Sequence, residues 1–573
     1  MKNLDNDFYA NHLDEPWLFF PADKHGSISR HEFYFRVNRL EDKIKSYRNN
    51  DQQKVVLVCE RPENFLLAFV AVIASGMTAL LAASRKPAML QSLFVQYPES
   101  LLITDTDSSY VPASTIIMTD FTADQSVPAG DVKLPQVSYS LLAAILFTSG
   151  STGKPKANHK HWGDLVKASA LMRQRLQLKP QDCLLVAVQP QHMYGFETQV
   201  LMPLLGGIGL FASQVFYPAD IYAAMKHLQE NGIKASLVIT PIQLRAMLGS
   251  GLDFSPLRQI ICSAAALSPH LAGQAEAQWK IPLTEIFGST ELGSVASRRT
   301  AKEELWKLYP QVSLQSEGNV YRVNADYLPH QPLLDDAIEL DEKDSRVFRL
   351  LGRASDLIKV AGKRASLMAL NNRLLDIPGV IDGVFVMPGD ARENPRPCAL
   401  VVAPDLNRET LFSALAEWLD PVFLPRPVYF VDRLPRETNG KLPRIKLMQL
   451  IEQLQKTTPE SIDIMSSVSL EHPALGGHFP DNSVIPGVVL LELVESCLEK
   501  HLGTRWRTYW VRQWLRVKFS RRLEPGQQCR VVIKFDSQNL QKGSFKLLDM
   551  AGHSLVTGQL YYAESEAESE TQA

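Results

Sequence analysis

The sequence predicts a large N-terminal α/β domain, a small α+β subdomain and a final α+β domain. Apolar runs typical of buried strands alternate with helical patterns from about residue 30 to 350, which favours largely parallel sheets covered by helices. A smaller unit begins at Gly352, and from Ile462 one helix is followed by several strand-like runs, as in an α+β domain. At 573 residues the chain is also too long for one core.

Short apolar runs predict the strands of the N-terminal domain, and Glu63–Ala74 predicts a buried helix. The predicted strands are Val55–Cys59, Leu101–Thr104, Ala143–Phe147, Leu184–Val188 and Leu237–Ile239. The stretch Phe65–Ala83 is apolar enough to suggest a membrane span. Ser75-Gly76 interrupts it, however, which favours a helix, a turn and a strand. We therefore expect no membrane span.

The rest of the chain divides by changes in pattern. The smaller unit is predicted to contain strands at Val384–Met387 and Ala399–Val402 and a helix at Glu409–Leu419. In the last domain the predicted helix is Gly487–Leu502, and the predicted strands are Ile464–Leu470, Trp514–Phe519, Gln528–Asp536, Ser544–Asp549 and His553–Tyr562. The predicted boundaries are 1–351, 352–455, a linker at 456–461, 462–564, and an acidic disordered tail at 565–573.

Composition narrows the functional classes. The net charge of −2 does not favour binding to nucleic acid or to an anionic membrane surface. Six scattered cysteines form no CxxC pair and no cluster at zinc spacing, and the polar N-terminus does not look like a signal peptide. We expect an enzyme with reduced thiols in the cytoplasm.

A loop rich in glycine, serine and threonine follows the strand predicted at Ala143–Phe147. Small residues let the backbone approach a phosphate, while hydroxyls and lysines bind it. The spacing of Gly150 and Gly153 and the presence of Pro155 exclude a Walker A loop. The candidate phosphate-binding residues here are Thr148, Ser149, Gly150, Ser151, Thr152, Gly153, Lys154 and Lys156.

This string resembles the signature of adenylate-forming enzymes, which include acyl-CoA synthetases, luciferase-like ligases and peptide-synthetase adenylation domains. Further strings resemble that family's motifs in the expected order: 190–195, 263–268, 287–291, 352–359 and 434–441. The resemblance covers nearly all of residues 1–455. The sequence differs from the family at Ala157, where glycine is usual, at Phe287, where tyrosine is usual, and at Leu334-Asp335, where Thr-Gly is usual.

The resemblance implies a reaction in which a carboxylate attacks the α-phosphate of ATP, so that catalysis is electrostatic and positional. Lys441 would bridge the reacting oxygens, Thr290 would donate to the α-phosphate, and Glu291 would hold Mg²⁺. The resemblance also assigns ATP binding to Gly288, Ser289, Asp336 and Arg353, and the acid pocket to His192, Tyr194, Gly195, Ser263 and Gly288. The small domain would rotate about a hinge at Ser355, after which a thiol of CoA or of a phosphopantetheinyl acyl carrier protein accepts the acyl group.

A second motif lies in the last domain. Gly477-His478-Phe479-Pro480 followed by Glu492 resembles the active site of hot-dog 3-hydroxyacyl-carrier-protein dehydratases over roughly 463–563. His478 would take the C2 proton, and Glu492 would protonate the leaving hydroxyl. Hot-dog domains of this type imply a homodimer. The family's usual residues are replaced at Asp481, Ser483 and Ser496. A thioesterase, or a non-catalytic module for dimerisation or carrier-protein binding, therefore remains an alternative.

Together the two resemblances predict a bifunctional enzyme that activates a small carboxylic acid and dehydrates a 3-hydroxyacyl thioester. The combination is similar to the fused ligase–dehydratases of aryl-polyene-type pathways, which implies an aromatic acid. A ligase whose hot-dog domain is a thioesterase or a binding module is the other possibility.

Overall fold

The structure is a computed structural model. It describes residues 12–21, 26–47, 54–82, 84–106, 112, 114–118, 132–148, 156–318, 320–353, 356–360, 363–387, 396–436, 442–456, 461–472, 485–502, 509–535 and 542–564. The chain forms two compact units: Met1–Lys359 with Arg364–Pro378 and Arg436–Pro443, and Val360–Lys363 with Gly379–Pro435 and Arg444–Ala573. The five-part division made from the sequence stays a prediction.

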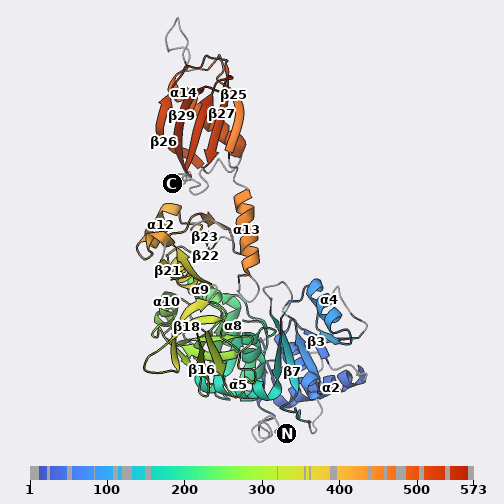
Figure 1. The fold of residues 1–573 in the computed structure, drawn as a ribbon. Helices are drawn as coiled ribbons and strands as arrows, with labels where there is room; N and C mark the ends of the chain where they lie inside the picture. Colours follow the sequence, from blue (N-terminus) through green and yellow to red (C-terminus); the bar gives the residue numbers. More distant parts are fainter. Residues whose placement is uncertain are drawn as a thin grey trace. The chain divides into compact units, whose positions relative to one another are not determined.

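An eleven-stranded sheet dominates the first unit as far as it is described (Figure 1). Its order is β18 (Asp336–Leu340), β19 (Val347–Arg353), β15 (Trp306–Leu308), β14 (Gly293–Arg298), β13 (Leu283–Ser289), β12 (Gln259–Cys262), β11 (Ala235–Ile239), β9 (Cys183–Val186), β10 (Gly209–Phe211), β1 (Pro16–Phe19) and β2 (Ser27–Ser29). From β1 to β13 neighbouring strands are parallel, whereas the strands beyond them are antiparallel.

A second sheet in this unit has the order β6 (Thr115–Ile117), β5 (Leu101–Thr104), β3 (Lys54–Val58), β4 (Thr78–Leu81), β7 (Leu142–Thr148) and β8 (Lys156–His161). Only β8 is antiparallel to its neighbour. The helices include α2 (Arg30–Tyr47), α3 (Pro62–Ala74), α4 (Pro87–Gln96), α5 (Trp162–Leu176), α8 (Pro218–Glu230), α9 (Pro241–Gly249), α10 (Pro269–Trp279) and α11 (Leu367–Leu375). The predicted arrangement of parallel strands with covering helices is confirmed. Both sheets also have antiparallel strands at their edges, which were not predicted.

The apolar stretch Phe65–Ala83 has the structure predicted for it. Helix α3 ends at Ala74, Gly76 turns the chain with a φ of +72°, and β4 begins at Thr78. All of α3 from Pro62 to Ile73 is buried in the protein core. No helix in the described ranges has the length and apolarity needed to cross a membrane.

The second unit begins with a three-stranded sheet of β22 (Asp382–Val386), β23 (Cys398–Val402) and β24 (Val428–Phe430), together with α12 (Arg408–Ala416) and α13 (Arg444–Lys456). Both predicted strands and the predicted helix are present. The linker predicted at 456–461 differs at both ends, because α13 continues through Lys456 and β25 begins at Ser461.

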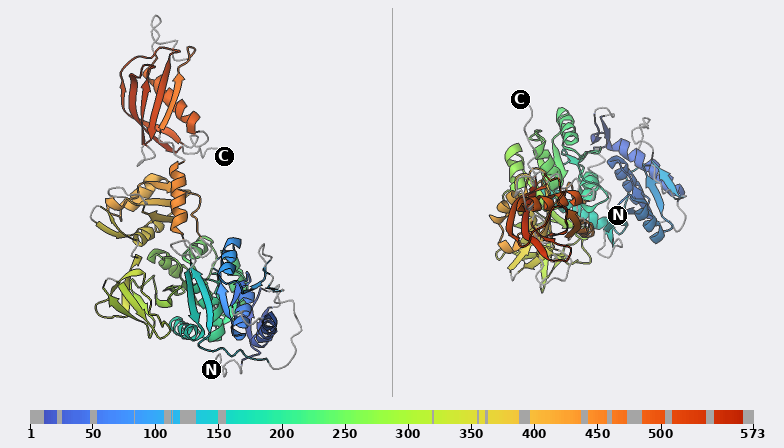
Figure 2. Two further views of the ribbon diagram at one scale, coloured as in Figure 1. Left: turned by 45° about the vertical axis from the view of Figure 1, so that its right-hand side comes forward. Right: turned by 90° about the horizontal axis from the view of Figure 1, so that it is seen from above.

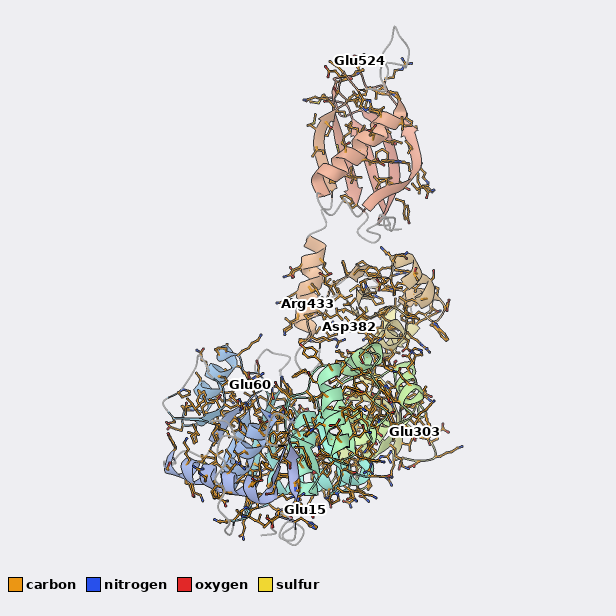
Figure 3. All side chains as sticks on the ribbon, turned by 180° about the vertical axis from the view of Figure 1, so that it is seen from behind. Glu15, Glu60, Glu303, Asp382, Arg433 and Glu524 are labelled. Carbon is orange, nitrogen blue, oxygen red and sulfur yellow. The ribbon has the colours of Figure 1, made fainter. Side chains whose placement is uncertain are left out.

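The C-terminal part of this unit has one helix on an antiparallel sheet of order β25 (Ser461–Ser467), β27 (Gln528–Phe535), β28 (Lys542–Leu548), β29 (Ser554–Glu564) and β26 (Tyr509–Phe519) (Figure 2). Helix α14 (Gly487–Leu502) spans the predicted residues, and its Val494 and Leu498 belong to the same buried core as Val531 and Ile533 of β27. Glu524, labelled in Figure 3, lies in the connection between β26 and β27.

The bounds of all five strands in this domain differ from prediction by one to five residues at one or both ends. Strand β25 runs from Ser461 to Ser467 rather than from Ile464 to Leu470, and the buried Val468 lies in the loop that follows. Strand β26 begins five residues earlier than predicted, at Tyr509. A register shift between Val511 and Gln513 interrupts its alternation, which hides its first half from a test for period-two patterns.

Candidate functional site

A tight hairpin turn presents Thr290 and Glu291 at the end of β13. Ser289 pairs with Gly293 across the ladder, and the backbone N–H of Leu292 donates to Ser289 Oγ at 3.3 Å. Gly293 has a φ of +70°, which favours glycine. A Cβ on Gly288 would lie 2.2 Å from the carbonyl oxygen of Gly293. The predicted glycine at 288 is therefore needed for the two strands to approach.

Two lysines of β8 contact this turn from the other sheet. Lys156 Nζ donates to Glu291 Oε1 at 3.2 Å, and Lys160 Nζ donates to the backbone carbonyl oxygen of Glu291 at 2.8 Å. Thr148 is the ladder partner of Lys156, and its Oγ1 accepts from Asn158 Nδ2 at 3.4 Å. The structure thus brings the ends of the predicted phosphate loop, Thr148 and Lys156, to the predicted metal ligand Glu291.

The environment of the turn changes the charge behaviour of both Glu291 and Lys160. Partial burial raises the pKa of Glu291, but hydrogen bonds from its own backbone N–H, Lys156 and Ser289 outweigh burial and leave that pKa below its usual value. Glu291 is therefore a carboxylate at neutral pH. Burial lowers the pKa of Lys160 to about 8, and the charges of Glu197, Glu291 and Asp164 limit the fall.

Of the predicted acid-pocket residues, Tyr194 and Ser263 are hydrogen-bonded near the carboxyl ends of β11, β12 and β13. His192 precedes α6 (Met193–Gly195), and Tyr194 Oη donates to the carbonyl oxygens of Ile261 at 3.0 Å and Ile239 at 3.3 Å. Ser263 Oγ donates to the carbonyl oxygen of Ile286 at 2.8 Å. The α6 segment packs tightly, because a Cβ on Gly195 would lie 1.9 Å from the carbonyl oxygen of Gln189.

Asp336 and Arg353, which the resemblance assigns to ATP binding, come together as well. Asp336 begins β18 and Arg353 ends β19, and these two residues are direct partners in the antiparallel ladder. The adjacent Gly352 has a φ of +103°, and a Cβ there would lie 2.7 Å from Ser366 Oγ. Asp336 and the backbone of Arg353 therefore occupy neighbouring positions at one sheet edge.

Several predicted site residues lie outside the described residues: Ser149, Gly150, Ser151, Thr152, Gly153, Lys154, Ser355, Lys441 and His478. Of the predicted dehydratase pair, the structure describes Glu492, which is on α14. Its Oε2 lies 3.7 Å from Nε2 of His472, and both side chains are at least partly exposed. His472 was not predicted from the sequence.

Three further residues near the turn were also missed: Lys160, Glu197 and Ser294. Glu197 lies on the π-helix η1 (Phe196–Leu201), is 2% exposed, and accepts from the backbone N–H of Ser294 at 3.0 Å and from Ser294 Oγ at 2.6 Å. Burial raises its pKa. The signal in the sequence was an acidic residue inside the otherwise uncharged run 195–205. π-Helical turns often occur at functional sites.

The sequence matches two family models. Residues 7–327, more than half of the chain, match the AMP-binding enzyme family. The chain belongs to the AMP-binding enzyme family. Residues 454–559 match the ApeI dehydratase family, and the C-terminal α+β domain is an ApeI-like hot-dog domain. Both resemblances found in the sequence are therefore confirmed.

The chain is also similar to individual ligases. A 2-succinylbenzoate–CoA ligase of Bacillus cytotoxicus is 25% identical over 440 residues, which cover 70% of this chain and 89% of that protein. A 4-coumarate–CoA ligase of Halorhodospira halophila is 27% identical, covering 52% and 73%. The structure of O-succinylbenzoate coenzyme A synthetase from Bacillus subtilis, in complex with AMP, superposes with a TM-score of 0.65 at 17% identity, covering 78% of this chain and 98% of that one.

The close approach at Gly288 gives a direct test of the hairpin. We expect Gly288→Ala to lower the melting temperature and to abolish stabilisation by ATP with Mg²⁺, because the new methyl would overlap backbone that cannot move independently. Differential scanning fluorimetry measures both effects.

The control is Gly273→Ala in α10, where an added Cβ meets nothing within 4 Å. Alanine there should be neutral, or stabilising by up to about 1 kcal/mol. Nucleotide stabilisation that survives Gly288→Ala would contradict the assignment of the hairpin to the ATP site.

Proposed function

We propose that this protein activates an aromatic carboxylic acid with ATP, transfers the acyl group to a thiol, and dehydrates a 3-hydroxyacyl thioester in its hot-dog domain. The observation that carries the first activity is the cluster of Thr148, Lys156, Lys160 and Glu291 around the β13–β14 turn. Membership of the AMP-binding enzyme family supports the same reaction.

The residues around the turn fit a site for ATP with Mg²⁺. The pKa of Glu291 lies below its usual value, so this partly buried residue supplies a charged oxygen ligand of the kind that Mg²⁺ prefers. Bound there, Mg²⁺ would neutralise phosphate charge. Thr290 would donate to the α-phosphate, and Lys156 would be free to bind phosphate once another cation occupies its carboxylate partner. Asp336 would accept from the ribose hydroxyls, and Arg353 would contact ribose or phosphate.

The reaction we propose has two steps, and its reactants are the acid, ATP and a thiol. A carboxylate oxygen of the acid attacks the α-phosphorus of ATP, pyrophosphate leaves, and Lys441 stabilises the charge that develops. The small domain then turns about Ser355, and a thiolate attacks the acyl carbon while AMP leaves. The acceptor thiol belongs to CoA or to an acyl carrier protein.

We infer an aromatic acid from the substrates named for related ligases. The two curated ligases described above act on 2-succinylbenzoate and 4-coumarate, both of which contain an aromatic ring. The ApeI-like domain on the same chain supports a place in an aryl-polyene-type pathway. An acid-thiol ligase with a thioesterase or a non-catalytic hot-dog domain is the alternative.

For the hot-dog domain we propose that His478 removes the C2 proton and that Glu492 protonates the departing hydroxyl. A homodimer through this domain is also proposed. The eleven-residue strand β26 lies at the edge of its sheet in the described chain, and edges of that length are usually covered. The six buried, free cysteines support a cytoplasmic location.

The first activity is tested by acid-dependent exchange of pyrophosphate into ATP with a panel of aromatic and aliphatic acids. We expect aromatic acids to support exchange, and Lys441→Ala to slow it by about 100-fold or more, as when a transition-state donor is removed. Lys302→Ala, at an exposed turn, is the matched lysine control and should exchange normally. Exchange that survives Lys441→Ala would remove Lys441 from the mechanism, and exchange with aliphatic acids alone would remove the aromatic assignment.

The second activity is tested by adding a 3-hydroxyacyl thioester and following the absorbance of the enoyl product. We expect dehydration, reduced by about 100-fold or more in His478→Ala. His553→Ala is the control, because His553 is an exposed histidine bonded to Asp549 in the turn before β29. Release of free thiol would indicate a thioesterase, and no reaction would indicate a binding module.

A further inference from the structure

A buried carboxylate lies behind the turn that carries Thr290 and Glu291. Glu197 is 2% exposed, and a carboxylate at such a position is costly unless its oxygens are hydrogen-bonded. Both of its oxygens accept from one residue: Oε1 from the backbone N–H of Ser294 and Oε2 from Ser294 Oγ. The approach is close, since a Cβ on Gly293 would lie 3.0 Å from Glu197 Oε1.

These two hydrogen bonds fix the first residues of β14. Ser294 is three residues after Glu291, and only three residues connect Ser289 to its ladder partner Gly293. A short connection has little freedom once both of its ends are fixed. The position of Glu197 therefore fixes the start of β14, where the three-residue connection ends.

Lys160 holds the same connection from the opposite sheet. Its Nζ donates to the backbone carbonyl oxygen of Glu291 at 2.8 Å, and the residue is only 9% exposed. The opposite charges of Glu197 and Lys160 also attract each other. The turn is thus held by Glu197 through Ser294 on one side and by Lys160 on the other.

We propose that Glu197 is a positioning residue, which acts through Ser294 to hold Thr290 and Glu291 in the geometry that binds ATP with Mg²⁺. This inference rests on the proposed adenylating function and adds a residue to it. A purely structural Glu197 would support the fold without affecting the ligand, so the two roles predict different results.

The test measures how much Mg²⁺ is needed for ATP to raise the melting temperature of the full chain. Glu197→Gln keeps the size of the side chain but replaces one acceptor oxygen with a donor that faces a donor of Ser294. We expect the Mg²⁺ midpoint at fixed ATP to rise about tenfold, equivalent to about 1.4 kcal/mol. Ser294→Ala removes only the hydroxyl, and should raise the midpoint about threefold.

Glu285→Gln is the matched control. Glu285 is a buried carboxylate on β13 that accepts from Leu267, Arg298 and Thr300, and its ladder partner is Arg298, at the other end of the hairpin. The Glu285→Gln variant should have a lower melting temperature without ligand and an unchanged Mg²⁺ midpoint.

Each outcome decides the inference. A lower melting temperature with an unchanged Mg²⁺ midpoint in Glu197→Gln would make Glu197 structural and overturn the proposal. If that variant does not fold, Ser294→Ala decides in its place, and an unchanged midpoint overturns the proposal. A wild-type chain that ATP and Mg²⁺ do not stabilise would instead reject the adenylating function itself.

Discussion

The organisation of the ligase part depends on the short turn between β13 and β14, which is held between two sheets. Glu291 belongs to the eleven-stranded sheet, yet its carboxylate and its backbone carbonyl oxygen both accept from lysines of the six-stranded sheet. Glycine at 288 and at 293 lets the hairpin close tightly enough to present these groups. Because both lysines lie on β8, directly after the predicted phosphate loop, any movement of that strand relative to β13 would separate the predicted phosphate ligands from the predicted metal ligand.

The sequence predicted what depends on local pattern. Leu101–Thr104 and Gly487–Leu502 have the predicted bounds, because an uninterrupted apolar run and a helix that follows a proline are local signals. The gathering of Thr148, Lys156 and Glu291 followed from motif order in a recognised family. Glu197 was missed because its role depends on Ser294, 97 residues away, and a single sequence contains no signal for such a pair. The start of β26 was missed because a bulge breaks the alternation.

The ligase part and the hot-dog domain each combine a family match with a matching fold. For the ligase part, family membership, the arrangement of strand ends and the charge of Glu291 agree. For the hot-dog domain, the family match and the fold agree, while Glu492 has His472 as a neighbour within the chain.

The most direct measurement of the central claim is the fate of a labelled carboxylate oxygen. The accepted acid, carrying ¹⁸O in both carboxylate positions, is incubated with ATP, Mg²⁺ and the acceptor thiol, and the products are weighed by mass spectrometry. Attack on the α-phosphorus predicts one ¹⁸O in AMP and one retained in the thioester. Label in inorganic phosphate with ADP as the nucleotide product, or AMP without label, would contradict activation through an acyl adenylate.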